Sequence, residues 1–406
     1  MSDALYDVVV FGATSFVGQI LCQYLSDTHG VDGDLKWAAA GRSRDKLEQV
    51  KASLGSTAST LPLITADAND AASLDALCAQ TAVVISTVGP YALYGEPMIR
   101  ACTESGTDYC DLTGEAQWIA AMLEKYEATA KKSGARIVHC CGFDSIPSDM
   151  GTFFLQQQAQ KQFKAPATRV AMRVKVAKGG VSGGTVASMM NIAEEASKDP
   201  ALRKKLANPY LLCPPSHGLT ARQHSITMPE YDEDLRAWVA PFVMDAINSR
   251  IVHRSNALND YSKDMTYNEG MLTGDGVGGR MKALGIGVGT GLFFGAAAMA
   301  PTRWALNKFV VPQPGEGPSP EAQKAGFYDV RFVGHTANGE MIKVKVTGDA
   351  DPGYGSTSKL LGEAAVCLAR DISSDAPGGF WTTASLLGEA LLKRLQSNAG
   401  LTFEVI

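Results

Sequence analysis

The first third of the chain alternates short apolar runs with longer amphipathic segments. The apolar runs have the length of β-strands, and the segments between them have helical periodicity. This alternation is typical of βαβ units, in which helices cover a parallel sheet. We predict strands at Tyr6–Phe11, Leu35–Ala40, Leu61–Ala66, Ala82–Val88, Asp108–Asp111 and Arg136–Cys140. We predict helices at Phe16–Ser26, Arg44–Leu54, Ala71–Ala79, Glu96–Ser105 and Ala116–Lys132.

Six strands joined by helical crossovers predict an α/β fold with a doubly wound parallel sheet of Rossmann type. A chain of 406 residues is long enough for a second domain, since a domain averages about 150 residues. After Pro147 the pattern changes to longer alternating strands. We therefore expect a dinucleotide-binding domain over 1–150 and a substrate or dimerisation domain over 151–406.

The second domain is predicted to be α+β with a mixed or antiparallel sheet. Its predicted strands are Thr168–Lys178, Tyr328–Val333 and Met341–Thr347, and the last two can form a hairpin through the polar turn 335–339. Its predicted helices are Thr185–Ser197, Ser356–Arg370 and Ala384–Gln396. The C-terminal helix could also pack back on the first domain.

Charge and cysteine usage restrict the partners and the compartment. The formal net charge of −5 supplies no basic excess, so we expect no nucleic-acid partner. The eight cysteines lack the paired spacing of a zinc site and are predicted to be reduced thiols, with no metal bound. The N-terminus has no basic segment followed by an apolar one, so we expect a cytoplasmic protein.

A glycine turn follows the first predicted strand and opens a helix. In this position, unpaired N–H groups and the positive helix end would face a pyrophosphate. Ser15 stands where the usual dinucleotide motif favours a glycine, so the spacing alone is a weak signal and its place after the first strand strengthens it. The predicted contacts are Gly12, Ala13, Thr14, Ser15, Phe16, Val17 and Gly18.

The second strand ends in basic and hydroxyl residues, Arg42, Ser43 and Arg44. An NAD site usually has an acidic residue here, whereas a guanidinium suits the 2′-phosphate of NADP. We therefore predict NADP(H) as cofactor; the alternative is a solvated helix start. Asp67 is predicted to lie near the adenine, or else to be a surface carboxylate.

The fourth strand ends in a small-residue turn. This turn could lie over the ribose and pyrophosphate, or could simply end the strand. Its residues are Thr87, Val88, Gly89, Pro90 and Tyr91.

Several local motifs together point to one family. They are GATSFVG (12–18), AGRS (40–43), VGPYALYGEP (88–97), YCDLTGE (109–115) and CGFDSIPSDMG (141–151). The chain resembles the saccharopine-dehydrogenase-like oxidoreductases, in the branch of the bacterial trans-acting enoyl reductases and the eukaryotic lipid-droplet-associated member. The resemblance implies a saccharopine-reductase-type nucleotide-binding domain with a second domain, and it defines the cofactor better than the substrate.

Hydride chemistry at a nicotinamide needs a group that supplies or removes a proton. Tyr94 and Tyr91 are candidate proton donors, although each could be a loop aromatic that packs on the cofactor. Asp144 could orient the nicotinamide or the ribose, or could cap the helix that starts near Pro147. His139 lies in an apolar strand and is predicted to be a core histidine.

Residues 283–300 form a run of eighteen residues without a charge, and basic residues flank it. The run is close to the length of about 20 residues that a membrane span requires. It could be a transmembrane helix, a buried helix at a homodimer interface, or a hairpin that faces a membrane or lines a lipid site. An acyl-chain substrate would explain this apolar segment.

The leading functional hypothesis is an NADP(H)-dependent oxidoreductase that reduces an unsaturated lipid or polyketide-type acyl group. A second hypothesis is a saccharopine-reductase-like amino-acid or imine dehydrogenase, for which Arg173, Arg222 and Arg254 could bind substrate carboxylates. A third is a noncatalytic NADP-binding protein at lipid surfaces. The expected partners are a small lipid-like substrate, a second copy of the chain, and the cytoplasmic face of a membrane through peripheral contact.

Overall fold

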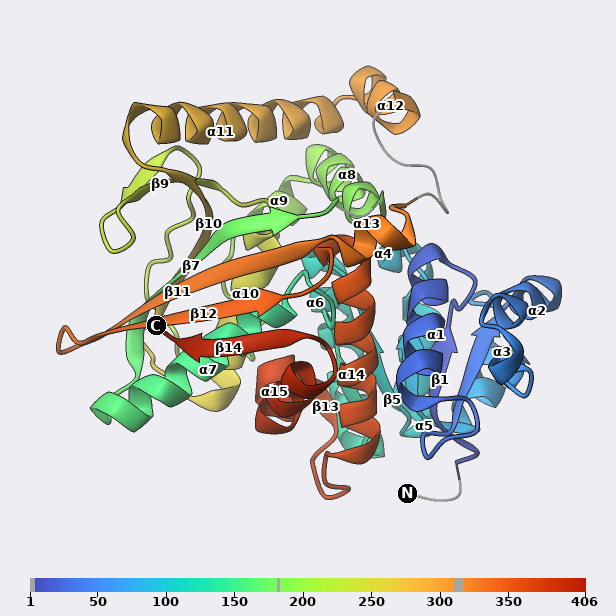
Figure 1. Cartoon of the computed structure of the whole chain (residues 1–406). Coiled ribbons are helices and arrows are strands. Elements are labelled where there is room, and N and C mark those ends of the chain that lie inside the picture. Colours follow the sequence, from blue (N-terminus) through green and yellow to red (C-terminus); the bar gives the residue numbers. More distant parts are fainter. Residues whose placement is uncertain (1–3, 181–182, 310–316) are drawn as a thin grey trace. The chain divides into compact units, whose positions relative to one another are not determined.

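The computed structural model describes residues 4–180, 183–309 and 317–406. These residues form two compact units that the chain enters more than once (Figure 1). The first unit holds the described residues up to Phe143, Gly317 and the segment Gly353–Ala399. The second begins at Asp144 and holds the other described residues. The boundary thus lies a few residues before the expected one at 150, and part of the expected second domain belongs to the first unit.

The first unit is built on a seven-stranded sheet in which every adjacent pair is parallel, as predicted for a Rossmann-type domain. The strand order is β13-β6-β5-β4-β1-β2-β3. The strands are β1 (Tyr6–Phe11), β2 (Trp37–Gly41), β3 (Leu63–Thr65), β4 (Thr81–Ser86), β5 (Asp108–Asp111), β6 (Arg136–Val138) and β13 (Gly379–Trp381). Buried valine and alanine side chains fill β1 and β2, as expected for a parallel sheet covered on both faces.

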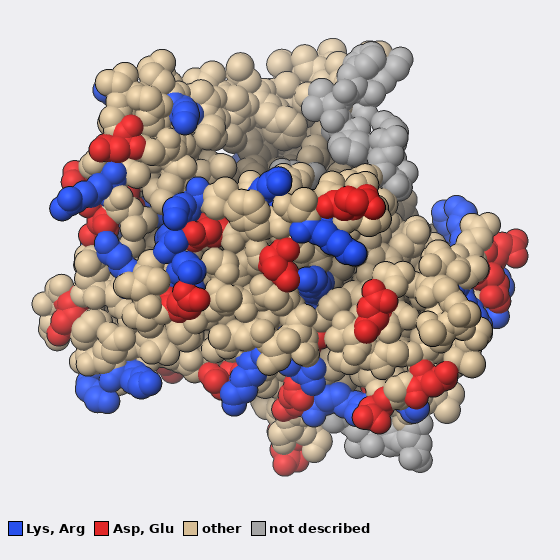
Figure 2. Space-filling view, in the orientation of Figure 1, with Lys and Arg blue, Asp and Glu red and all other residues tan. Residues whose placement is uncertain are grey.

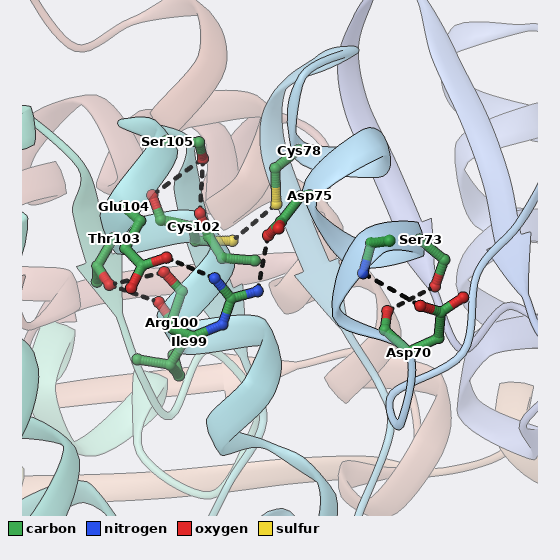
Figure 3. Close-up of polar contacts among 12 residues, drawn as sticks. Asp70, Ser73, Asp75, Cys78, Ile99, Arg100, Cys102, Thr103, Glu104 and Ser105 are labelled. Carbon is green, nitrogen blue, oxygen red and sulfur yellow. Dashed lines mark hydrogen bonds and ion pairs between the residues drawn. The ribbon is translucent and has the colours of Figure 1, made fainter.

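The helices of the first unit are α1 (Phe16–His29), α2 (Arg44–Ser53), α3 (Ala71–Cys78), α4 (Tyr91–Tyr94), α5 (Glu96–Ser105), α6 (Ala116–Ser133), α14 (Thr357–Arg370) and α15 (Gly388–Ser397). Helices α3 and α5 lie side by side (Figure 3). There Arg100 forms ion pairs with Asp75 and Glu104, and the sulfur atoms of Cys78 and Cys102 are 3.7 Å apart. All eight cysteines of the chain are free thiols.

The C-terminal segment of the first unit is anchored by a buried carboxylate. Helix α14 packs against α1 and contacts β1, β4 and β5. Glu363 of α14 accepts a hydrogen bond from the hydroxyl of Tyr24 at 2.7 Å, and its other oxygen contacts Arg394 and Asn398. These contacts hold the pKa of Glu363 below its usual range although burial opposes ionisation. The segment that includes the C-terminal helix α15 therefore packs on the Rossmann-type sheet and its helices.

The second unit contains a mixed seven-stranded sheet with the order β14-β12-β11-β7-β10-β9-β8. Its strands are β7 (Ala167–Lys178), β8 (Glu230–Asp232), β9 (Ala237–Pro241), β10 (Thr266–Gly274), β11 (Phe327–Thr336), β12 (Met341–Gly348) and β14 (Leu401–Val405). Strands β7 and β10 are parallel, and the other pairs are antiparallel. The predicted hairpin is present as β11 and β12, and the predicted α+β fold is confirmed.

The helices of the second unit are α7 (Ile146–Phe163), α8 (Gly183–Lys198), α9 (Pro200–Leu206), α10 (Asp245–Asn259), α11 (Gly276–Ala298), α12 (Ala300–Phe309) and α13 (Pro320–Lys324). Helix α7 packs on β11 and β12, and α10 packs on β10 and α7. Helix α11 contains most of the uncharged run and contacts β9, β10 and α8 (Figure 1). It is long and apolar enough to cross a membrane. Only 11% of its most apolar 18-residue stretch is buried, so it is not a core helix of the second unit.

Candidate active site

The predicted cofactor residues lie at the carboxyl ends of adjacent strands. Because β4, β1, β2 and β3 are neighbours and parallel, the turns that follow them meet at one edge of the sheet. The amides of Gly12 and Ala13 donate to the carbonyl of Ala40 at 3.0 and 3.1 Å. These bonds place the turn after β1 beside the end of β2, directly before Gly41 and Arg42.

Gly12 is required by a close approach between two strand ends. Its φ of +92° lies in the left-handed region, and a Cβ there would lie 2.6 Å from the hydroxyl oxygen of Thr87. The hydroxyl of Thr87 donates to the carbonyl of Gly12 at 2.9 Å. The turns after β1 and β4 are thus joined, and Gly12, Thr87 and Val88 form one wall of the site.

Ser15 has a structural role that explains why it replaces a motif glycine. Its Oγ accepts a hydrogen bond from the amide of Gly18 at 2.9 Å and caps the N-terminus of α1. The same oxygen lies 3.0 Å from the hydroxyl of Thr87. The amides of Phe16 and Val17 precede the first internal hydrogen bonds of α1, so this helix end favours an anion.

The three residues after β2 differ in their freedom to bind a ligand. Arg44 contacts Glu48 at 2.7 Å and the carbonyl of Leu63 at 3.0 Å. Ser43 caps α2 through the amide of Lys46. Arg42 is exposed and has no polar partner among the described residues. Of the predicted cationic pair, Arg42 is therefore the guanidinium available for a phosphate.

Asp67 lies one strand further along the same edge, after β3. Its Oδ1 accepts a hydrogen bond from the amide of Asn69 at 2.9 Å and so stabilises the turn that precedes α3. The carboxylate is half-buried. It lies on the side of the sheet expected for the adenine end of a dinucleotide, but its Oδ1 already has a local structural role.

Tyr91 is part of the core of the first unit, which argues against a role as proton donor. Its hydroxyl donates to the carbonyl of Ser86 at 2.8 Å, and its ring packs against Trp118. Only 4% of the residue is exposed, and desolvation, followed by the charge of Asp111, raises its pKa well above the ordinary value. A phenol held in this way keeps its proton well above neutral pH, so Tyr94 is the better placed of the two candidate donors.

Tyr94 is placed differently, at the end of the short helix α4. It is 40% exposed and has no polar partner among the described residues. The adjacent Gly95 allows α4 to approach α6, because a Cβ at Gly95 would lie 2.5 Å from the Trp118 ring. Tyr94 therefore remains a candidate to contact a ligand.

Asp144 opens the second unit and is half-buried. It has no hydrogen-bond partner among the described residues, and desolvation raises its pKa to about 7. The cap position of α7 belongs to Ser145, whose hydroxyl donates to the Oδ1 of Asn248 at 3.0 Å. Asp144 therefore does not serve as the helix cap, and its carboxyl group can exchange a proton near neutral pH.

His139 is a core histidine, as the sequence predicts. Its Nδ1 lies 2.7 Å from the Oδ2 of Asp111, and 3% of its side chain is exposed. Aromatic rings of Tyr109, Trp118 and Phe380 surround it. This environment indicates a structural role.

Comparison with known proteins identifies the family. The sequence model of the saccharopine dehydrogenase NADP-binding domain matches residues 8–138. A Mycobacterium tuberculosis protein with the provisional name trans-acting enoyl reductase is 40% identical over 381 residues, which are 90% of this chain and 89% of that protein. The trans-acting enoyl reductase of Mycobacterium ulcerans is 35% identical over 387 residues, with the same coverage.

The chain belongs to the trans-acting enoyl reductase branch of the saccharopine-dehydrogenase-like family. The fold agrees, since an apo saccharopine dehydrogenase from Saccharomyces cerevisiae superposes with a TM-score of 0.51 at 12% identity over 99% of this chain and 100% of that one. The expected family membership is confirmed, and the chain is an NADP-dependent oxidoreductase.

The geometry of the first unit fits the NADP of this family. Gly12 allows the turns after β1 and β4 to approach closely, the end of α1 favours an anion, and Arg42 at the adjacent strand end has no polar partner in the described part of the chain. The matched range 8–138 contains the turns after β1, β2, β3 and β4. The predicted cofactor is confirmed, and the individual contacts remain predictions.

Two further residues shape the site beside its predicted contacts. The Oε1 and Oε2 of Glu115 accept hydrogen bonds from the amides of Tyr91 and Ala92 at 2.9 and 3.0 Å, so this buried carboxylate holds the α4 turn. Tyr354 packs edge-on against Phe16 of the glycine turn, with ring centroids 4.9 Å apart. Glu115 belongs to the motif YCDLTGE (109–115), and a carboxylate in this motif is the sequence feature that points to it.

Proposed function

We propose that this trans-acting enoyl reductase homologue reduces the carbon–carbon double bond of an α,β-unsaturated acyl thioester with NADPH. The names of its relatives support this reaction class. The observation that carries the proposal is Asp144, a half-buried carboxyl group without a polar partner in the described chain and with a pKa raised to about 7. Such a group is partly protonated at neutral pH and can act as a general acid.

The reaction adds one hydride and one proton across the double bond. When bound, NADPH would supply the hydride to the β-carbon and leave as NADP⁺. The resulting negative charge is delocalised over the α-carbon and the thioester carbonyl, and the carboxyl group of Asp144 gives its proton to the α-carbon. Solvent then reprotonates Asp144.

The reaction can be tested with purified protein, NADPH and enoyl thioesters, using absorbance for NADPH loss and mass spectrometry for the saturated product. Asp144→Asn should lower kcat by about a hundredfold or more, within the usual contribution of a general acid. Wild-type kcat should fall as pH rises above about 7, because Asp144 then loses its proton. Asp264→Asn, which changes an exposed aspartate elsewhere in the second unit, is the matched control.

NADPH binding without turnover of any enoyl thioester would contradict the proposed reaction and would favour a noncatalytic NADP-binding protein. Two of the three arginines considered for a saccharopine-type reaction, Arg173 and Arg254, give it no support, and the third, Arg222, is exposed. Arg173 contacts Asp232 at 2.8 Å, and the buried Arg254 donates to the carbonyl of Leu212. Neither guanidinium is free to anchor a substrate carboxylate.

We also propose that the substrate is lipid-like and that the protein works at the cytoplasmic face of a membrane. The support is a line of exposed apolar side chains on α11 at helical spacing: Val277, Met281, Leu284, Val288 and Leu292. Trp304 is 61% exposed beyond the end of α11, and Arg280 and Lys282 flank its start. Aromatic and basic flanks suit a membrane interface. A second copy of the chain is the alternative occupant of this line.

A further inference from the structure

An apolar groove lies in the second unit between α8 and α11. Its volume is about 380 Å³, within the range of small-molecule sites. Figure 2 shows the uncharged surface over much of α11 and a hollow below it. The groove is lined by Val186 and Met189 of α8, by Val243, and by Ile286, Gly289 and Phe293 of α11.

The chemistry of the groove suits a hydrocarbon chain. Its lining has no ionisable side chain, and the hydroxyl of Thr290 is its one polar side-chain group. A nucleotide, sugar or thioester head would lose its hydration here without gaining partners, at a cost in free energy. An aliphatic chain has no such cost and gains the free energy of apolar burial.

Gly289 keeps this groove open. A Cβ at Gly289 would meet no atom within 4 Å, so close packing within the chain does not require a glycine at this position. A glycine within a helix is less favourable than an alanine, because it loses more backbone freedom on folding. The missing side chain therefore leaves space in the wall of the groove at a cost to the helix.

The groove walls are held together at the end of α11. The Nη2 of Arg303 contacts the Oε1 of Glu194 in α8 at 3.0 Å, and its Nη1 donates to the carbonyl of Ala297 in α11 at 3.0 Å. The separation of α8 and α11 is therefore supported by polar contacts outside the groove, and the apolar walls need not meet each other.

We propose that this groove binds the aliphatic chain of the acyl substrate, an inference that rests on the proposed function. The groove holds the tail of the substrate, and the reacting thioester lies elsewhere, because the groove has no group able to exchange a proton. Affinity for substrate therefore rises with chain length.

The test replaces Gly289 with leucine. Gly289→Leu fills the groove from α11, whereas Gly291→Leu adds the same side chain on nearly the opposite face of the helix, where a Cβ also meets nothing within 4 Å. With hexadecenoyl thioester, Gly289→Leu should lower kcat/KM by about tenfold or more, as expected for the loss of about two buried methylenes. With crotonyl thioester it should change kcat/KM less than about twofold, and Gly291→Leu should match wild type with both.

A binding measurement separates the groove from the reaction. Without NADPH, wild type and Gly291→Leu should bind a fluorescent saturated long-chain fatty acid, and Gly289→Leu should bind it about tenfold more weakly. If the three proteins bind the fatty acid in this way but no enoyl thioester is reduced, the groove is a hydrocarbon-binding site and the proposed function is refuted. Equal binding of the fatty acid by the two variants, or no binding by wild type, would contradict the proposal that the groove binds an aliphatic chain.

If Gly289→Leu does not fold, Met189→Trp fills the groove from α8 and should have the same selective effect on the long chain. Thermal unfolding of each variant establishes that it is folded before the kinetic comparison. Loss of activity with crotonyl and hexadecenoyl thioesters alike in a folded Met189→Trp protein would contradict a tail-binding groove.

Discussion

At the scale of single residues, the site depends on groups whose environment changes their chemistry. Asp144 is protonated near neutral pH because desolvation raises its pKa to about 7, whereas burial keeps Tyr91 protonated far above neutral pH. The sequence placed both residues near the ends of strands, which follows from the parallel topology. The sequence could not show that the hydroxyl of Tyr91 donates a hydrogen bond to the carbonyl of Ser86, because that contact depends on tertiary packing.

The raised pKa of Asp144 also leads to a prediction of how the stability of the protein changes with pH. The folded protein keeps the Asp144 proton up to about pH 7, whereas an unfolded aspartate loses it near pH 4, about its ordinary pKa. The folded state binds more protons in this window, so the Asp144 contribution to stability is lost as pH rises through it. Asparagine cannot ionise, so the Tm of Asp144→Asn minus that of wild type should be larger at about pH 8 than at about pH 5. An equal difference at both pH values, measured by differential scanning fluorimetry, would contradict the raised pKa.

Glu115 provides a second prediction at this scale. Glu115→Ala leaves the amides of Tyr91 and Ala92 without these acceptors, and buried unpaired amides cost about 1–3 kcal/mol each. The urea midpoint of unfolding should therefore fall clearly. Glu104→Gln, which changes an exposed glutamate paired with Arg100 (Figure 3), should move the midpoint little. Equal shifts in the two variants would argue against the capping role of Glu115.

At the scale of elements, strands were predicted well where short apolar runs end at turns. The bounds of β1 and β5 are those predicted, because each run is flanked by residues that favour a turn. Strand β13 was missed, since three residues carry little periodicity and its place depends on pairing with β6, more than 200 residues earlier. Helix α10 was missed because its buried residues include Asn248, His253 and Arg254, which reverse the usual pattern.

A buried ion pair links two elements of the parallel sheet. The amide of Arg136 in β6 donates to the Oδ1 of Asp108 in β5 at 2.8 Å, and its guanidinium contacts the Oδ2, with 3% and 4% of the two side chains exposed. Arg136→Met should destabilise the protein by about 3–5 kcal/mol, because it leaves the carboxylate buried without its counter-charge. Asp108→Leu combined with Arg136→Met should recover part of this loss in urea unfolding. Additive losses would show that the pair is not coupled.

At the scale of the whole molecule, the chain crosses between its units more often than the sequence indicated. The alternating pattern defined the Rossmann-type domain, whereas the return of residues 353–399 to it depends on contacts such as those of Glu363. Sequence periodicity reports which face of an element is apolar. It does not report which of two sheets that face will contact, so this return could not be derived from the pattern.

The exposed line on α11 gives a prediction for the whole protein. Wild type should sediment with phospholipid vesicles, and Leu292→Glu should release it, because burying the new carboxylate in lipid is costly. Met228→Glu, which changes an exposed methionine outside α11, is the control and should sediment like wild type. A wild-type dimer that does not sediment and that Leu292→Glu dissociates would identify a second copy of the chain as the partner.

The central claim is that the turn at Gly12 and the guanidinium of Arg42 bind one NADP molecule. Isothermal titration calorimetry tests it most directly, with NADPH and NADH titrated into wild type, Arg42→Ala and Arg44→Ala. The account predicts that Arg42→Ala weakens NADPH binding by about tenfold to a hundredfold and leaves NADH unchanged, because a charged hydrogen bond contributes about 1.5–3 kcal/mol. Arg44→Ala should have a smaller effect, since Arg44 contacts Glu48 and Leu63. Equal affinity of wild type and Arg42→Ala for NADPH, or no heat with NADPH at all, would contradict the account.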